Sequence, residues 1–213
     1  MIVIKPYFVI ESDVDGAKML RHIEKAGRTC YKSEDRISGE SAENFVRSLI
    51  QRGHESVIEH CSVTVRVICD RAVSHEIVRH RIASYSQEST RYCNYTKDKF
   101  CNQITFIEPC FWDKNTSEGR SKYEDWENAM ESAEKSYFTL IEKGASPQEA
   151  RSVLPNSLKT EIVMTLDLRS WRNFFKQRAS ASAHPQMREI AVPMLDKFKQ
   201  AIPVIFDDII PNQ

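Results

Sequence analysis

Cys61-Ser-Val-Thr-Val-Arg-Val-Ile-Cys69 is the stretch of the sequence on which the fold interpretation depends. Valines occupy positions 63, 65 and 67, and polar residues occupy positions 62, 64 and 66. Because successive side chains of an extended chain point to opposite faces, this alternation predicts a β-strand with one buried face. A short helix over about residues 71–80 is expected to follow the strand.

Other segments have the spacing of helices or strands. A Ser-Pro-Gln-Glu capping box at residues 146–149 predicts the start of a short helix that carries Arg151. Longer helices are expected where apolar residues recur every three or four positions, over residues 13–27, 41–52, 117–144, 170–178 and 186–200, the last with a kink at Pro193. Further strands are expected over residues 1–11 and 158–168. The mixture predicts an α+β protein.

Length and composition limit the class of protein. A chain of 213 residues is long enough to bury a core, so we expect a single domain over residues 1–213. The chain has 30 Lys plus Arg and 30 Asp plus Glu residues, so it has no net field that would attract nucleic acid or an anionic membrane. A signal segment after Met1 is lacking, as is the apolar run of roughly 18–20 residues that a membrane span needs. The protein is therefore expected to be soluble and cytoplasmic.

The cysteines and histidines do not follow the spacing of a metal site. The six cysteines lack a Cys-x-x-Cys pair, and without a secretion signal reduced thiols are favoured over a disulfide framework. His54 and His60 lie six positions apart, which does not match a metalloprotease pair on a helix. No metal site is therefore expected, and His54 is expected at a helix end, at a ligand edge or in a core hydrogen bond.

Glycine and arginine indicate how an anion would be bound. The six glycines form neither Gly-x-Gly-x-x-Gly nor a Walker loop, so any dinucleotide must be held by side chains. Between Lys32 and Lys97, every permanently cationic residue is arginine, whose planar fork grips phosphate or carboxylate in two places. Specific anion recognition and ordinary surface ion pairs are both compatible with these arginines.

Residues 79–92, Arg-His-Arg-Ile-Ala-Ser-Tyr-Ser-Gln-Glu-Ser-Thr-Arg-Tyr, combine such side chains in one segment. If the second half of this segment is extended, one face carries Tyr85, Gln87, Ser89 and Arg91. An amide, a hydroxyl and a guanidinium would then lie side by side, which is a suitable cradle for a phosphate or a nucleotide.

Arg79, His80 and Arg81 are expected to behave differently from that face. Successive helical residues point about 100° apart, so three consecutive residues cannot all reach one small ligand from a helix. Either the helix ends before them, or they serve different ligands, or they reach across a subunit boundary. The alternative without a ligand is a solvated helix on which Glu76 pairs with Arg79 and His80.

The same residues resemble the signature of the flavin-dependent thymidylate synthase family: Arg79-His80-Arg81, seven residues, then Ser89, with Ser84 and Arg91 in place. The resemblance covers residues 45–192 and continues through Gly53-His54-Glu55, Glu59-His60, Ala150-Arg151, Leu154-Pro155, Arg169-Ser170, Asn173, Arg178, His184 and Gln186. It implies a fold of the thymidylate synthase-complementing-protein type, with an antiparallel sheet flanked by long helices. It also implies a homotetramer whose active sites are each built from several subunits.

The resemblance implies a reaction as well. dUMP would receive a methylene group from 5,10-methylenetetrahydrofolate and a hydride from FADH2, with NADPH reducing the flavin and tetrahydrofolate being released. Protein cations would polarise the uracil in place of a cysteine nucleophile. The residues implied for FAD are Ser56, Arg79, His80, Arg81, Gln87, Asp167, Leu168, Arg169 and Asn173. Those implied for dUMP are Glu76, Arg79, Gln87, Glu88, Ser89, Thr90, Arg91, Arg151 and Arg178, with Arg178 as the catalytic residue that orients and polarises the uracil.

The sequence departs from the family pattern at two positions. Ser86 and Asp167 stand where the family often has asparagine. Asp167 would place an uncompensated negative charge near the flavin unless Arg169 pairs with it. Neither change removes a phosphate ligand, so altered tuning is expected more than lost activity.

Two other functions remain open on the sequence alone. A flavin or nicotinamide reductase without methyl transfer would use the same anion-binding residues. A single-strand nucleic-acid binder would use the arginines together with Tyr85, Tyr92 and Tyr95 as stacking platforms. The zero net charge and the carboxylates interleaved with the arginines oppose nucleic-acid binding.

Overall fold

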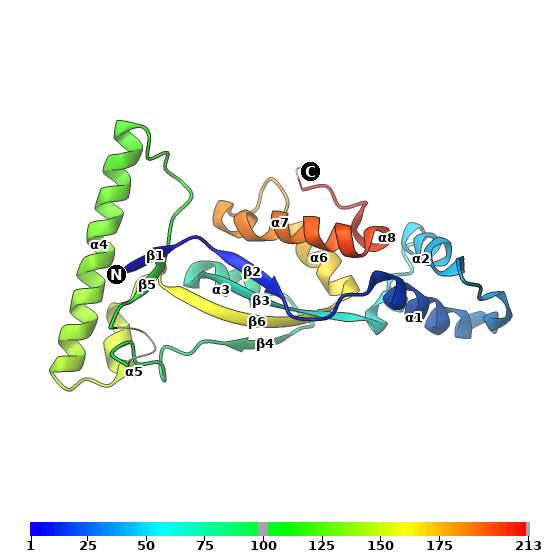
Figure 1. Ribbon diagram of the computed structural model, residues 1–213, viewed down its shortest axis with the longest axis horizontal. Coiled ribbons are helices and arrows are strands. Elements are labelled where there is room, and N and C mark those ends of the chain that lie inside the picture. The colour runs from blue at the N-terminus through cyan, green and yellow to red at the C-terminus, as the bar shows by residue number, and fades with distance from the viewer. Residues whose placement is uncertain (98–101, 212–213) are drawn as a thin grey trace. The chain divides into compact units, whose positions relative to one another are not determined.

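The computed structural model describes residues 1–97 and 102–211 (Figure 1). The chain clusters into two compact units. The first unit takes in residues 1–7 and 67–78 and the described part of 86–162. The second takes in residues 8–66 and 79–85 and the described chain from 163 onward. Cys101, one of the six cysteines, lies outside the described residues.

Four strands form the main sheet, in the order β2 (Tyr7–Ile10), β3 (Ser62–Asp70), β6 (Lys159–Asp167) and β4 (Ser84–Gln87). Hydrogen bonds join Leu168 to Cys61, Thr165 to Thr64 and Leu158 to Arg71. Because the residue number falls along β6 as it rises along β3, the two strands are antiparallel. The predicted strand over residues 61–69 is confirmed, and its valines at 63, 65 and 67 are fully buried.

The N-terminal segment forms two strands instead of one. β1 (Ile2–Ile4) pairs in parallel with β5 (Thr105–Ile107) in a separate two-stranded sheet, and β2 begins only at Tyr7. The prediction of one strand over residues 1–11 is therefore wrong. Pro6 lies at the break, and a proline lacks the N–H that a strand donates to its neighbour.

The predicted helices are present, with shifts of a few residues at their ends. They are α1 (Gly16–Arg28), α2 (Ser41–Gln51), α3 (Arg71–Ile77), α4 (Ser117–Glu142), α5 (Pro147–Ala150), α6 (Leu168–Arg178) and α7 (Pro185–Ala201). The sequence interpretation missed α8 (Pro203–Phe206) and the 3-10 turns η1 (Thr29–Tyr31), η2 (Glu34–Arg36), η3 (Glu55–His60) and η5 (Arg151–Val153). Within the described residues, no helix combines the length and the apolar character needed to cross a membrane.

Side-chain caps explain where several helices begin. The side chains of Asp15, Asp70, Thr116 and Asp167 each accept a hydrogen bond from a backbone N–H in the first turn of the helix that follows. The capping box at Ser146 and Glu149 is also present and confirms the predicted start of α5. Such caps satisfy backbone donors that a helix itself cannot pair.

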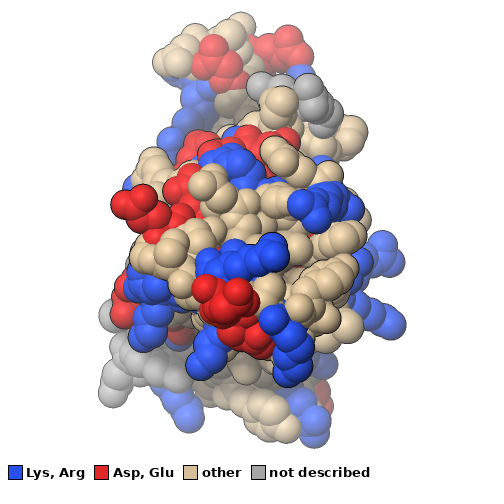
Figure 2. Space-filling view, turned by 90° about the vertical axis from the view of Figure 1, so that its right-hand side faces the viewer, with Lys and Arg blue, Asp and Glu red and all other residues tan. Residues whose placement is uncertain are grey.

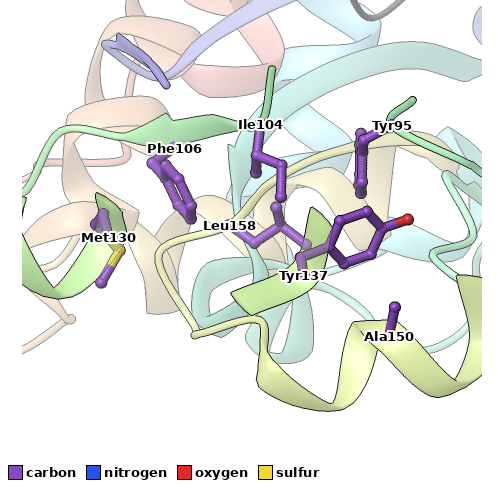
Figure 3. Packing of buried hydrophobic residues seen from close by; sticks show 7 residues of the cluster. All are labelled: Tyr95, Ile104, Phe106, Met130, Tyr137, Ala150 and Leu158. Atoms are coloured by element: carbon purple, nitrogen blue, oxygen red, sulfur yellow. The ribbon is translucent and has the colours of Figure 1, made fainter. Parts of the chain in front are cut away.

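Each unit has its own hydrophobic core. In the first unit, α4 and its neighbours bury the cluster drawn in Figure 3: Tyr95, Ile104, Phe106, Met130, Tyr137, Ala150 and Leu158. In the second unit, Trp171 and Phe175 of α6 pack against Phe198, and Phe175 also packs against Phe206. The Trp171 indole also donates to the carbonyl of Val63 at 3.1 Å, which fixes α6 against β3.

Candidate functional site

A cavity of about 420 Å³ lies in the second unit, where β6 ends and α6 begins. It is lined by side chains of η3, of the segment before β4, of the end of β6 and of α6: Glu55, Glu59, Arg81, Ile82, Asp167, Arg169, Ser170, Asn173 and Lys176. Three of these residues are acidic and three are basic. The cavity can therefore offer donors and acceptors to a polar ligand without a large net charge.

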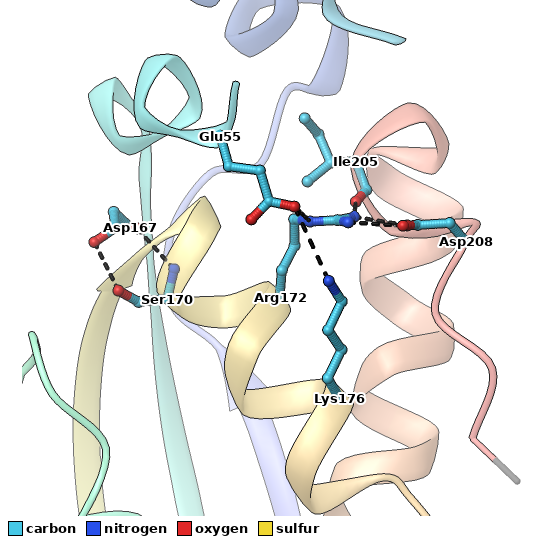
Figure 4. Close-up of polar contacts among 7 residues, drawn as sticks. All are labelled: Glu55, Asp167, Ser170, Arg172, Lys176, Ile205 and Asp208. Atoms are coloured by element: carbon cyan, nitrogen blue, oxygen red, sulfur yellow. Dashed lines mark hydrogen bonds and ion pairs between the residues drawn. The ribbon is translucent and has the colours of Figure 1, made fainter. Parts of the chain in front are cut away.

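Asp167 stands at the start of α6. Its two carboxylate oxygens accept hydrogen bonds from the backbone N–H and the hydroxyl of Ser170, both at 2.8 Å (Figure 4). The positive end of the helix therefore offsets the carboxylate charge. Arg169 does not supply this compensation by a hydrogen bond, because its guanidinium donates to Glu59 at 2.6 Å. Asp167 is thus accommodated as a helix cap.

The Arg169–Glu59 pair is exposed to solvent. The two side chains are 53% and 44% exposed, and an exposed ion pair is typically worth only about 0–1 kcal/mol. An anionic ligand can therefore displace Glu59 from the Arg169 guanidinium with little loss of free energy. Arg81 is exposed at the same cavity wall.

His80 and Arg178 form a second pair in this unit. The Nε of Arg178 donates to the Nε2 of His80 at 2.8 Å. The ring of Phe174 packs edge-on against the imidazole, with 4.9 Å between the ring centroids. His80 is buried, whereas Arg79 and Arg81 are exposed. Since α3 ends at Ile77, the helix stops before all three residues, and the interpretation of His80 on a solvated helix is wrong.

The environment keeps His80 neutral. Burial, followed by the nearby Arg178 charge, lowers the pKa of His80 from 6.5 to about 4. A neutral imidazole presents a lone pair at Nε2, which is the acceptor that the Arg178 guanidinium requires. His80 therefore restrains Arg178 at neutral pH.

This pairing predicts a pH dependence of stability. As pH falls from 6.5 toward 4, the unfolded chain protonates position 80 while the folded chain does not, so the free energy of unfolding should decrease. His80→Gln keeps an acceptor that does not titrate, so this part of the pH dependence should disappear in urea unfolding curves. His80→Leu should lose the same slope and also be less stable than the wild type near neutral pH, because the Arg178 guanidinium loses the acceptor at His80. An unchanged slope in His80→Gln would contradict the assignment.

The first unit gathers most of the residues implied for dUMP. The amide of Gln87 donates to the hydroxyls of Ser74 and Thr160 at 2.9 and 3.2 Å. The carboxylate of Glu88 accepts from Lys159, and the hydroxyl of Thr90 accepts from Arg151. The guanidinium of Arg91 donates to the side chain of Gln148, and its backbone N–H donates to the hydroxyl of Ser89. Arg91 and Arg151 thus lie on the same contact network as Gln87–Thr90.

The predicted common face of this segment is only partly correct. β4 ends at Gln87, and the chain then turns, with the N–H groups of Tyr92 and Cys93 donating to the carbonyl of Ser89. Ser89 and Arg91 therefore do not continue the strand face of Tyr85 and Gln87. Their hydroxyl and guanidinium are instead presented by a turn, which the sequence interpretation did not anticipate.

The remaining predicted residues are distributed as follows. Ser56 lies in η3, Leu168 is buried at the start of α6, and Glu76 is on α3 in the first unit. The sequence interpretation assigned no role to Glu55, Glu59, Ser170 or Lys176, although all four line the cavity. The resemblance named Glu55, Glu59 and Ser170 without a role, and the signal available for Lys176 was its three-residue spacing from Asn173, since such residues share a face of an α-helix.

The amino-acid sequence matches a protein-family model and several known proteins. A family model described as thymidylate synthase complementing protein matches residues 14–204. The flavin-dependent thymidylate synthase of Corynebacterium efficiens is 34% identical over 207 residues, which cover 93% of this chain and 82% of the relative. That of Geobacter sulfurreducens is 35% identical over 194 residues, covering 88% and 80%.

A solved structure has the same fold. The crystal structure of a UMP/dUMP methylase from Streptomyces cacaoi, bound with 5-Br dUMP, matches with a TM-score of 0.79 at 21% identity. The match covers 97% of this chain and 96% of that chain. It confirms the predicted α+β fold with an antiparallel sheet.

Proposed function

The chain belongs to the family of flavin-dependent thymidylate synthases, and from this premise we propose that it converts dUMP to dTMP. The methylene group comes from 5,10-methylenetetrahydrofolate, and NADPH reduces the flavin. The observation that carries the proposal is the cavity of the second unit. Four residues expected to bind the flavin, Arg81, Asp167, Arg169 and Asn173, line it together.

The side chains of this cavity fit a flavin dinucleotide. Two guanidinium groups suit a diphosphate, and the Asn173 amide both donates and accepts hydrogen bonds. We assign FAD binding to Arg81, Asp167, Leu168, Arg169 and Asn173, with Ser56, Arg79, His80 and Gln87 as further contacts. When bound and reduced by NADPH, the flavin would supply the hydride that completes the methyl group.

The phosphate and sugar of dUMP are assigned to the turn after β4 and to its partners. Arg91 and Arg151 offer guanidinium groups that can grip a phosphate in two places. Glu76, Arg79 and the residues from Gln87 to Thr90 complete the proposed dUMP site. Gln148 and Thr90 already restrain the two arginines, so less conformational freedom is lost when the phosphate binds.

Arg178 is proposed to activate the pyrimidine. Uracil C5 is a poor nucleophile, and a guanidinium that donates to the uracil oxygens stabilises the negative charge that develops there when C5 attacks. A cysteine that adds to the ring is not needed. Burial raises the pKa of Cys61, and it raises that of Cys69 more strongly, so these thiols do not form the reactive thiolate easily.

The assembly and the compartment are part of the proposal. We place FAD and dUMP at active sites completed by several copies of the chain in a homotetramer, acting as one domain per copy. We place the reaction in the cytoplasm because Cys30, Cys61 and Cys69 are free thiols, as a reducing compartment maintains them.

The expected outcome of purification is a yellow protein whose flavin absorption bleaches with NADPH. Addition of dUMP and 5,10-methylenetetrahydrofolate should reoxidise the flavin and form dTMP, which liquid chromatography would measure. A reductase without methyl transfer would bleach and reoxidise in air but form no dTMP. A colourless protein that takes up no FAD would contradict the proposal.

Nucleic-acid binding is not favoured by the distribution of charge. Figure 2 shows Lys and Arg interspersed with Asp and Glu on one face of the molecule. A nucleic-acid binder usually gathers positive charge on one face or along one helix.

A further inference from the structure

Arg172 on α6 is a buried cation, only 2% exposed. Its Nη1 and Nη2 donate to the two oxygens of Asp208 at 2.6 and 2.7 Å, and Nη1 also donates to the carbonyl of Ile205 (Figure 4). Its Nε donates to Oε1 of Glu55 at 3.0 Å. The guanidinium of Arg172 thus connects two parts of the chain: η3, through Glu55, and the segment after α8, through Asp208.

Glu55 is held by one oxygen. Arg172 and Lys176 both contact Oε1, Lys176 from 4.0 Å. Within the described parts of the chain, no contact of Glu55 involves Oε2, and Figure 4 shows this oxygen on the side away from both cations. Because Glu55 lines the cavity, a fixed carboxylate with one available oxygen faces the ligand space.

We propose that Glu55 binds the flavin dinucleotide by accepting a hydrogen bond from one of its hydroxyl groups through Oε2, and that Arg172 and Asp208 are positioning residues for this carboxylate. The inference rests on the proposed function, since it takes the cavity as the flavin site. Hydroxyl groups occur on the ribityl chain and on the adenosine ribose, and a carboxylate is a strong acceptor for either.

The role of Asp208 follows from charge balance. Asp208 takes the two terminal nitrogens of Arg172, so Glu55 needs to offer only one oxygen to the remaining N–H. Without the Asp208 charge, Arg172 would attract both oxygens of Glu55, and Oε2 would turn away from the cavity. Asp208 is not among the residues that line the cavity, so it acts on the ligand only through Arg172.

The test is a titration of the flavin-depleted full chain with FAD, followed by flavin fluorescence, well below the unfolding temperature of each variant. Glu55→Gln should raise the Kd for FAD about tenfold, because a charge-assisted hydrogen bond is lost. Asp208→Asn should raise the Kd in the same direction, and the double variant should bind no worse than Glu55→Gln. Asp207→Asn is the matched control, since this exposed neighbour has no side-chain contact in the described structure, and its Kd should not change.

A parallel titration with FMN separates the two hydroxyl sources. If Glu55→Gln weakens FAD and FMN alike, the partner is on the ribityl chain, and if it weakens FAD alone, the partner is on the adenosine ribose. Both results support the proposal. An unchanged Kd for FAD in Glu55→Gln overturns it, and an effect of Glu55→Gln without one of Asp208→Asn overturns the positioning part.

Thermal unfolding and the wild-type titration distinguish other failures. A purely structural role of Asp208 would lower the unfolding temperature and leave the Kd unchanged, which also overturns the positioning part. A wild-type chain that binds no FAD would overturn the proposed function together with this inference. Wild-type binding with an unaffected Glu55→Gln variant would overturn the inference alone.

Discussion

Replacement of Arg178 by alanine is expected to lower kcat for dTMP formation by about 10²–10³-fold, the usual cost of losing one donor to a developing oxyanion. The donor is held in place, because its Nε bonds to the buried and neutral His80. Arg178 is not among the residues that line the cavity, so bound FAD, measured by its absorption, should be retained. Steady-state assays of dTMP formation give kcat directly.

Matched variants make this result specific. Arg178→Lys keeps the charge but not the planar fork, so an intermediate loss is expected. Cys61→Ser and Cys93→Ser should remain close to full activity, because the proposed chemistry uses no thiol nucleophile. Full turnover in Arg178→Ala, or turnover abolished by a single cysteine substitution, would contradict the mechanism.

The largest effect on stability is expected at Trp171. The side chain is fully buried among Phe174, Phe175 and Phe198, and truncation of a buried aromatic residue to alanine typically costs about 3–5 kcal/mol. Trp171→Ala also leaves the carbonyl of Val63 without its indole donor. Urea unfolding monitored by circular dichroism should give this difference.

Trp112→Ala is the comparison for Trp171→Ala. Trp112 is only partly buried, so its truncation should cost less than about 1.5 kcal/mol. Similar losses in both variants would mean that the aromatic cluster around α6 does not stabilise the second unit in particular.

Local patterns were sufficient to predict the long helices and the two long strands, β3 and β6. The alternating valines predicted β3 because its two faces differ in polarity, and the capping box predicted α5 because its hydrogen bonds lie within four residues. The parallel pairing of β1 with β5 was not predictable in this way. It joins Ile2 to Thr105, and nothing in either short segment specifies the other.

The sequence predicted which residues belong to the candidate site better than it predicted how these residues are arranged in space. The family resemblance identified Arg81, Asp167, Arg169 and Asn173, which line one cavity, but the confirmed fold leaves their roles as proposals. The resemblance included Glu55 but gave it no role, because its importance depends on Arg172. In the sequence, Arg172 is an ordinary cation in an aromatic run, and only the packing of α6 and α8 makes it a buried one.

The balanced charges of the cavity affect how a ligand arrives. Equal numbers of carboxylates and cations cancel at a distance, so the cavity exerts little long-range pull on anions. Capture then depends on several hydrogen bonds formed together after collision. Small inorganic anions, which cannot form that set of bonds, should therefore compete poorly with the proposed flavin dinucleotide, even where salt and free phosphate are abundant.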